Sequence, residues 1–147
     1  MTKEERFNLR LKKERAEKGF TTLDAIDINL WFMNIMPRML KVFRRSITDE
    51  GGIPLMFLEE FYELNKDRIN MSKDDFLYFN HSIDEELRLE AKEYAHTKWL
   101  SELDKMIFLF KEANKNMCHI EDKFEYGKKC QKEALEMFVK YFDDLNW

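Results

Sequence analysis

The sequence predicts an all-α fold, a compact bundle of four or five main helices around a buried central helix at about 83–114. Three observations predict this class. Apolar residues, 44% of the chain, recur at the three- and four-residue spacing of helices, and no convincing strand pattern appears. Only four glycines and two prolines occur among 147 residues, which disfavours turn-rich β folds. Charged residues make up 37%, which suits long helices with solvated outer faces.

The central helix is predicted from the stretch 99–113. Seven apolar side chains cover most of its circumference: Trp99, Leu100, Leu103, Met106, Ile107, Phe108 and Phe110. A helix that is apolar nearly all round is usually buried, so we expect this stretch to lie in the dry middle of the domain. Asp104 and Lys105 are the exceptions within it.

The N-terminal residues predict a charged helix over 3–18. It ends at Gly19, a residue suited to the left-handed conformation that follows many helices. Acidic residues interleave the basic ones, which favours a solvated helix. The alternative is a basic arm that contacts nucleic acid.

A second helix is expected over about 23–46, capped by Thr21 or Thr22. Two apolar stripes indicate that it is mostly buried. Pro37 lies in its middle, where it removes an amide donor and clashes with the carbonyl of Met33. We therefore expect a kink at this point.

The remaining elements have recognisable start signals. After a loop at 49–54 come a helix at about 55–68, a short element opened by Ser72, the long helix opened by a capping box at 82–85, and a last helix at about 121–143. Leu145 and Trp147 extend the apolar stripe of the last helix, so we expect the chain end to be packed.

The totals favour one helical domain, 20–147, preceded by the charged helix within 1–19. A net charge of −4 gives no general attraction to nucleic acid or to an anionic membrane, and neither is an expected partner. The N-terminus is too charged for a signal peptide, and no apolar run reaches the roughly 18 residues of a membrane span. Cys118 and Cys130 lack CxxC spacing, so we expect reduced thiols in a cytoplasmic protein.

A pattern of motifs covers about half of the chain: Asp27 and Trp31, Pro37-Arg38-Met39-Leu40, Phe43, Gly52-Ile53-Pro54, Leu103-Asp104-Lys105-Met106-Ile107, and Met137-Phe138 with Lys140-Tyr141-Phe142. This pattern resembles a family of small, uncharacterised phage-encoded proteins. This chain departs from the pattern by a longer segment between Pro54 and Trp99. The resemblance implies a phage origin, the cytoplasm of the host cell and a helical fold, and it supplies no catalytic residues.

One face of the second helix carries polar and aromatic candidates for an anion-binding or nucleotide-binding site: Trp31, Asn34, Arg38, Lys41 and Arg45. Arginine forks suit a phosphate or carboxylate, and a tryptophan ring stacks on a base. The structural alternative is that Arg38 pairs with Asp104 or Asp27 while Lys41 and Arg45 are solvated.

Four glutamates are candidates for a metal site. Glu60 and Glu63 lie three apart on one expected helix, and Glu90 and Glu93 lie three apart on another. Carboxylates from two helices can hold Mg²⁺. The arrangement is faintly similar to the MazG-like all-α nucleotide pyrophosphohydrolases, whose second pair normally ends in Asp where this chain has Glu93. The alternative is a solvated acidic face.

Other reactive residues form weaker patterns. His96 fits a hydrogen-bonded core histidine. Cys118, His119 and Cys130 lack a further ligand at metal-site spacing, and neither cysteine has the framework of a nucleophile. Gly51-Gly52 is not followed by the lysine of a phosphate loop.

The sequence therefore favours a non-enzymatic binding protein without a cofactor. On the phage resemblance, its expected role is to counteract a host defence system, by binding a protein effector or by sequestering an anionic nucleotide signal. The alternatives are the Mg²⁺-dependent nucleotide hydrolase and a structural adaptor that forms a homodimer through its Met- and Phe-rich surface.

Overall fold

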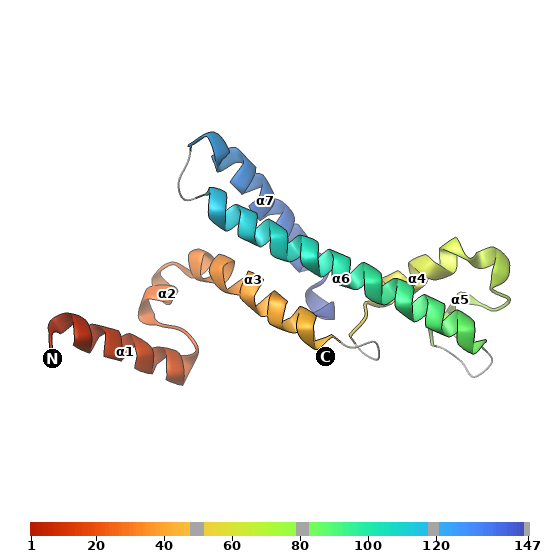
Figure 1. Ribbon diagram of the computed structural model, residues 1–147, viewed down its shortest axis with the longest axis horizontal. Helices are drawn as coiled ribbons and strands as arrows, with labels where there is room; N and C mark the ends of the chain where they lie inside the picture. The colour runs from red at the N-terminus through yellow and green to blue at the C-terminus, as the bar shows by residue number, and fades with distance from the viewer. Residues whose placement is uncertain (48–51, 79–82, 118–120, 146–147) are drawn as a thin grey trace.

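The computed structural model describes residues 1–47, 52–78, 83–117 and 121–145, and within these ranges it is helical and contains no strand (Figure 1). The elements are α1 (Lys3–Lys18), α2 (Thr22–Ile26), α3 (Ile28–Ser46), α4 (Leu55–Leu64), η1 (Lys66–Arg68), α5 (Lys73–Leu77), α6 (Glu85–Asn116), α7 (Glu121–Lys140) and η2 (Phe142–Asp144). The all-α class is confirmed. None of the described helices is long and apolar enough to cross a membrane.

Helix α6 is the axis of the fold. Its N-terminal half lies beside α4, while its C-terminal half lies beside α3 and α7 (Figure 1). Trp99, Leu103, Met106 and Phe110 are fully buried on one face, as their spacing predicts. Phe108 differs, because its side chain is 55% exposed. The helix is thus buried on a broad face rather than all round.

Aromatic rings join the helices around this face. The indole of Trp99 contacts Phe43 of α3, Phe57 of α4 and Tyr141 after α7, with ring centroids 5.1–6.3 Å apart. Phe32 of α3 lies edge-on to Phe110 of α6 and Phe138 of α7. Rings of this size bury much apolar surface each, so they fix how three helices meet.

The expected second helix is divided in two. Asp27, with φ −122° and ψ 66°, separates α2 from α3. Thr21 and Asp24 form a complete capping box at the start of α2, which makes it a separate local unit. The prediction that 23–46 is mostly buried is wrong for its first third, since four apolar residues there are at least half exposed: Leu23, Ile26, Ile28 and Leu30. The buried residues of α3 are Met33, Pro37 and Leu40.

Pro37 is accommodated through a hydrogen bond from another helix. A proline ring nitrogen has no hydrogen to donate to the carbonyl four residues earlier, which here belongs to Met33. The side-chain amide of Asn114 on α6 donates to that oxygen at 2.7 Å. The proline therefore creates an acceptor inside the bundle, and the facing helix satisfies it.

Several predicted boundaries are confirmed within a few residues. Gly19 ends α1 with φ 79°, and the Ser72 hydroxyl caps α5 by accepting from the amide of Asp75. Helix α6 begins two residues later than expected, with Asp84 as its cap, and continues to Asn116, past the expected break.

The C-terminal stripe is confirmed in part. Cys130, Ala134, Met137 and Tyr141 are buried, and Leu145 packs against the core, whereas Phe142 is largely exposed. Several sequence-based predictions fall on residues outside the described ranges: 49–51, Phe79, Ser82, Cys118, His119 and Trp147.

A first prediction concerns the acceptor created by Pro37. We expect Asn114→Ala to lower the free energy of unfolding by about 1–3 kcal/mol, because it leaves a buried carbonyl unsatisfied. In a Pro37→Ala background the new backbone amide at position 37 can donate to the Met33 carbonyl. Asn114→Ala should then lower the free energy of unfolding by less than about 1 kcal/mol. Urea unfolding of the four proteins measures this coupling, and equal costs in both backgrounds would contradict it.

A second prediction concerns Gly127, which is buried on α7. A Cβ there would lie 2.9 Å from Met117 Cγ and 3.1 Å from the backbone of Asn116 and Met117. Glycine to alanine inside a helix usually stabilises by about 1 kcal/mol. Here we expect Gly127→Ala to destabilise by about 1–2 kcal/mol through overpacking. The matched control, exposed Lys129→Ala, should change stability by less than about 0.5 kcal/mol.

Candidate functional site

The five sequence-predicted site residues share one face of α3, but the structure places them in two groups. Since Met33, Pro37 and Leu40 face the core, the polar residues between and after them face outward. Asn34, Arg38, Lys41 and Arg45 are exposed, and Trp31 is half-buried. Trp31, Asn34 and Arg38 line a groove against α1 and α2, whereas Lys41 and Arg45 lie toward α6.

The groove has a volume of about 350 Å³. Trp31, Asn34 and Arg38 form its α3 side, and Arg15, Asp24 and Asp27 lie on the other side. Hydrogen bonds hold this other side of the groove in place, because Asp24 accepts from the Thr21 amide and from the Arg15 guanidinium, both at 2.7 Å. The Thr21 hydrogen bond and the Arg15 guanidinium hold the pKa of Asp24 below its usual value. Two arginines face two aspartates, so this groove is close to neutral.

Trp31 also lines a second, apolar depression. Phe20, Ala25 and Ile28 surround it, with a volume of about 370 Å³. The indole therefore stands between a polar and an apolar hollow, which leaves its ring accessible to a flat ligand from either side. The side-chain amide of Asn34 is already engaged, since it donates to the Leu30 carbonyl at 2.9 Å.

The second group is cationic and continues onto α6. Lys41 lies beside Lys111 of α6 and near Arg45, and all three side chains are exposed. The close approach of Lys111, with partial desolvation and Arg45, lowers the pKa of Lys41 below its ordinary 10.5. Such crowding of like charges favours an anion between them.

Ion pairing around this group differs from the expected alternative. Asp104 pairs with Arg44, whose Nε and Nη2 lie 2.5 Å and 2.8 Å from the two carboxylate oxygens, and not with Arg38. Among the described residues, none of Arg38, Lys41, Arg45 and Lys111 forms an ion pair. We name these four residues the cationic face.

The four glutamates of the metal-site alternative do not converge. Glu60 accepts from Tyr94 Oη at 2.6 Å and Lys98 Nζ at 3.0 Å, whereas Glu63 pairs with Lys66. Glu90 pairs with Arg68, and Glu93 is exposed. Across residues 1–47, 52–78, 83–117 and 121–145, no group of three or more metal-ligating side chains could hold an ion. Among the described residues, the four glutamates therefore do not form the metal site that the hydrolase alternative needs.

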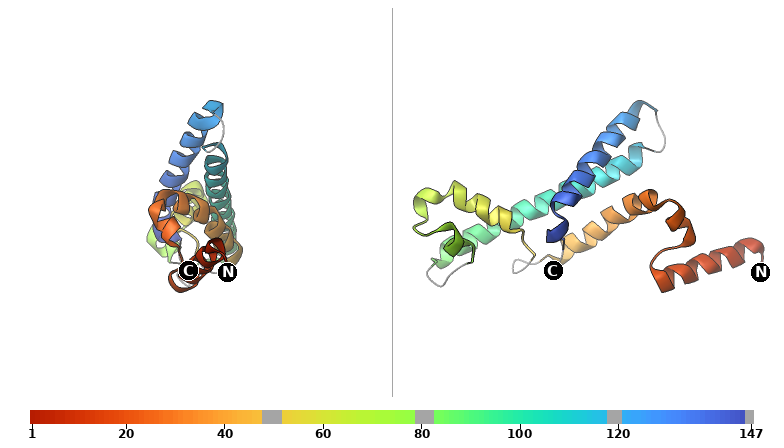
Figure 2. Two further views of the ribbon diagram at one scale, coloured as in Figure 1. Left: turned by 90° about the vertical axis from the view of Figure 1, so that its left-hand side faces the viewer. Right: turned by 180° about the vertical axis from the view of Figure 1, so that it is seen from behind.

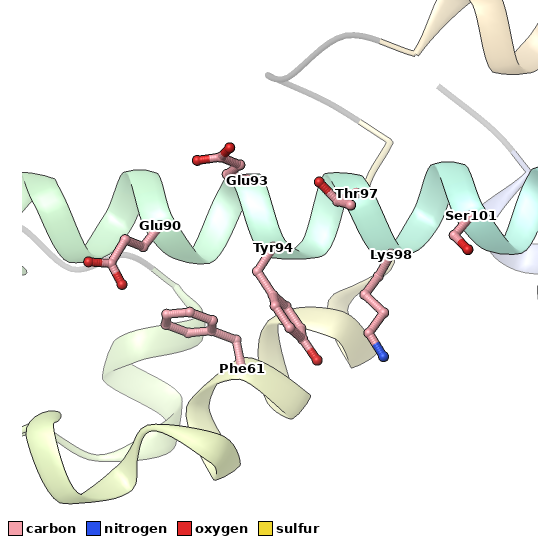
Figure 3. A pocket seen from close by; sticks show the side chains of 7 residues that line it. All are labelled: Phe61, Glu90, Glu93, Tyr94, Thr97, Lys98 and Ser101. Atoms are coloured by element: carbon pink, nitrogen blue, oxygen red, sulfur yellow. The ribbon is translucent and has the colours of Figure 1, made fainter.

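Two of these glutamates instead line an open groove between α4 and α6, with a volume of about 610 Å³ (Figure 3). Glu90, Tyr94 and Lys98 point from α6 toward α4, while Glu93 points away (Figure 3). Hydrogen bonds from Tyr94 and Lys98 lower the pKa of Glu60. The polar groups of this cluster therefore pair with one another. The groove offers hydroxyls and an aromatic wall but no free cation in its lining.

His96 and Cys130 have no role in these sites. His96 is half-buried on α6, and the thiol of Cys130 is buried in the core. Cys118, His119 and Gly51 lie outside the described residues.

Compared with known proteins, the chain matches no protein-family model, no curated protein and no solved structure. The resemblance to phage-encoded proteins therefore stays a prediction.

Sequence reasoning missed the residues that other helices bring to the site. Lys111 lies on a different helix from Lys41, and Arg15 and Asp24 come from the segment before α3. Lys111 follows exposed Asp104 by seven residues, which marks a shared helix face. No sequence signal says that this face adjoins Lys41.

A third prediction follows from the pKa of Glu60. Folding lowers the pKa of the Glu60 carboxyl below 4.5. The stabilisation of the folded state by this carboxylate is therefore complete above pH 4.5, and it is lost as the pH falls through the pKa of the folded state. We expect Glu60→Gln to lower the urea midpoint at pH 7 and to have a smaller effect at pH 3. Glu93→Gln, an exposed neighbour, should leave the midpoint unchanged at both values.

Proposed function

We propose that this protein is a non-enzymatic binding protein that holds a phosphate-bearing ligand on the exposed side of α3. The observation that carries the proposal is the cationic face, in which Lys41 and Lys111 approach each other across two helices without a described acidic partner. Holding like charges together costs stability, and an anion between them removes that cost. Guanidinium forks at Arg38 and Arg45 add bidentate contacts to phosphate oxygens.

The ligand class we propose is a nucleotide. Trp31 and Lys41 are ten residues apart, which corresponds to about 15 Å along a helix axis. That span suits a molecule with a ring at one end and phosphates at the other. The accessible indole of Trp31 would stack on the base, and Arg38 lies between the ring and the lysines.

The wider role we propose rests on the phage resemblance. A phage-encoded protein in the host cytoplasm would counteract a defence system by sequestering its anionic nucleotide signal. A defence effector that presents acidic side chains to the same face is the alternative partner. The two are separated by whether free nucleotides compete for the site.

A fourth prediction tests the site by titration calorimetry with cyclic and linear nucleotides, and with inorganic pyrophosphate as a phosphate-only probe. We expect binding that weakens with salt, and a loss of about tenfold or more in affinity for Lys41→Gln, Lys111→Gln and Arg38→Ala. Trp31→Ala should weaken nucleotides but not pyrophosphate. Unchanged affinity in Lys41→Gln and Arg38→Ala would reject the site.

The stability of the same variants provides an internal control. Since the pKa of Lys41 is lowered on folding, its charge disfavours the folded state below that pKa, including at pH 7. Lys111→Gln should therefore raise the melting temperature at low salt while it weakens binding. Lys105→Gln, exposed on α6 outside the cationic face, should change neither. In infected cells that carry a defence system, Arg38→Ala should remove protection of the phage.

A further inference from the structure

Residues 1–26, which we name the arm, project away from the rest of the chain. Figure 1 and the right-hand view of Figure 2 show α1 beyond the N-terminal end of α3, apart from α4, α6 and α7. No residue of α1 or α2 is buried within these helices. The arm is nonetheless ordered internally, because Thr22 donates twice to Glu14, at 2.7 Å and 2.9 Å, and Arg15 pairs with Asp24.

The accessible surface area of the chain is larger than that of a compact monomer of the same mass. It amounts to 10630 Å², whereas a compact protein of 18.0 kDa exposes about 8,000 Å². The excess of about 2,600 Å² is well above the roughly 800 Å² per partner of a standard protein interface. The surface that a second chain needs is therefore present.

Exposed apolar side chains occur on several elements, including one group on the arm and one beside a groove. On the arm, Phe20, Leu23 and Ile26 are exposed, and Ile26 reaches 71%. The other group lies beside a groove of about 450 Å³ between α3 and the end of α7, which we name the α3–α7 groove. It is lined by Met36, Met39, Phe43, Phe138, Phe142 and Leu145.

The arm and the C-terminal side of the groove carry opposite charges. Residues 1–26 hold seven basic and five acidic side chains, a net +2, which leaves −6 for the rest of the chain. Beside the groove, residues 133–145 hold four acids against one lysine. Asp143 lines the groove itself, and beside it burial raises the pKa of Asp144. The basic charge of α1 thus matches the acidic residues 133–145, and the apolar side chains of residues 20–26 match the apolar lining of the groove.

We propose that the protein forms a homodimer in which the arm of each copy packs in the α3–α7 groove of the other. The exchange is reciprocal, so the interface is closed by a twofold axis. It covers the apolar residues of the arm and groove, and leaves the cationic face on the outer side of α3. The interface shares Phe20 and Leu23 with the hollows beside Trp31 but contains none of the four residues of the cationic face, so pyrophosphate binding and dimer formation can each fail alone.

A fifth prediction tests the assembly by sedimentation equilibrium on the full chain, with circular dichroism to verify folding. We expect a mass of twice 18.0 kDa. Ile26→Asp on the arm and Met39→Asp in the groove should each weaken the dimer at least tenfold. Leu64→Asp, at an equally exposed position on α4, should leave the dimer intact. A monomeric wild type at every soluble concentration overturns the proposal, as does a dimer that Ile26→Asp leaves unchanged.

Charge reversal distinguishes arm exchange from any other twofold contact. Arg6→Glu with Lys12→Glu makes the arm acidic, and Asp143→Lys with Asp144→Lys makes the groove basic. Each double variant alone should be monomeric, because its own arm and groove then carry like charge. A mixture of the two should form a heterodimer, since both contacts become complementary. A mixture that stays monomeric overturns reciprocal exchange.

Discussion

Trp99, Leu103, Met106 and Phe110 form one strip of α6 that water does not reach, and α3, α4 and α7 keep their places by burying it. Burial of side chains this large stabilises by roughly 1.5–3 kcal/mol each, far more than an exposed ion pair. Phe108 lies outside the strip and stays in water. The positions of α3, α4 and α7 therefore depend on this single face of α6.

The burial of α3 against that face determines where its chemistry lies. Met33, Pro37 and Leu40 point inward, so the cations of α3 must point outward. Pro37 strengthens this orientation, because it cannot donate a hydrogen bond to the Met33 carbonyl, and the side-chain amide of Asn114 on α6 donates to it instead. A rotation of α3 that buried Arg38 would leave that carbonyl without a partner. The cationic face is thus held by an apolar core and one hydrogen bond, neither of which carries charge.

The sequence predicts those parts of this arrangement that depend on local pattern. The buried strip of α6, the end of α1 at Gly19, the Ser72 cap and the effect of Pro37 on the Met33 carbonyl all follow from spacing or from one residue type. The sequence does not predict the break at Asp27, because an apolar stripe continues through it and Asp27 makes no side-chain capping bond. Lys111 beside Lys41, and the close contact at Gly127, depend on which helices lie side by side. Helical periodicity does not contain that information.

The surroundings of the cationic face explain why it suits a small anion. Outside residues 1–19 the chain carries −7, so a long nucleic acid is repelled by most of the surface it would have to cover. Charges in physiological salt are screened beyond about 8 Å, so a compact phosphate ligand experiences only the nearest groups. Those groups are Arg38, Lys41, Arg45 and Lys111, and Asp104, which lies nearby, is already paired to Arg44. On the proposed function, an acidic protein with this cationic face would therefore bind a nucleotide in preference to a polymer of nucleotides.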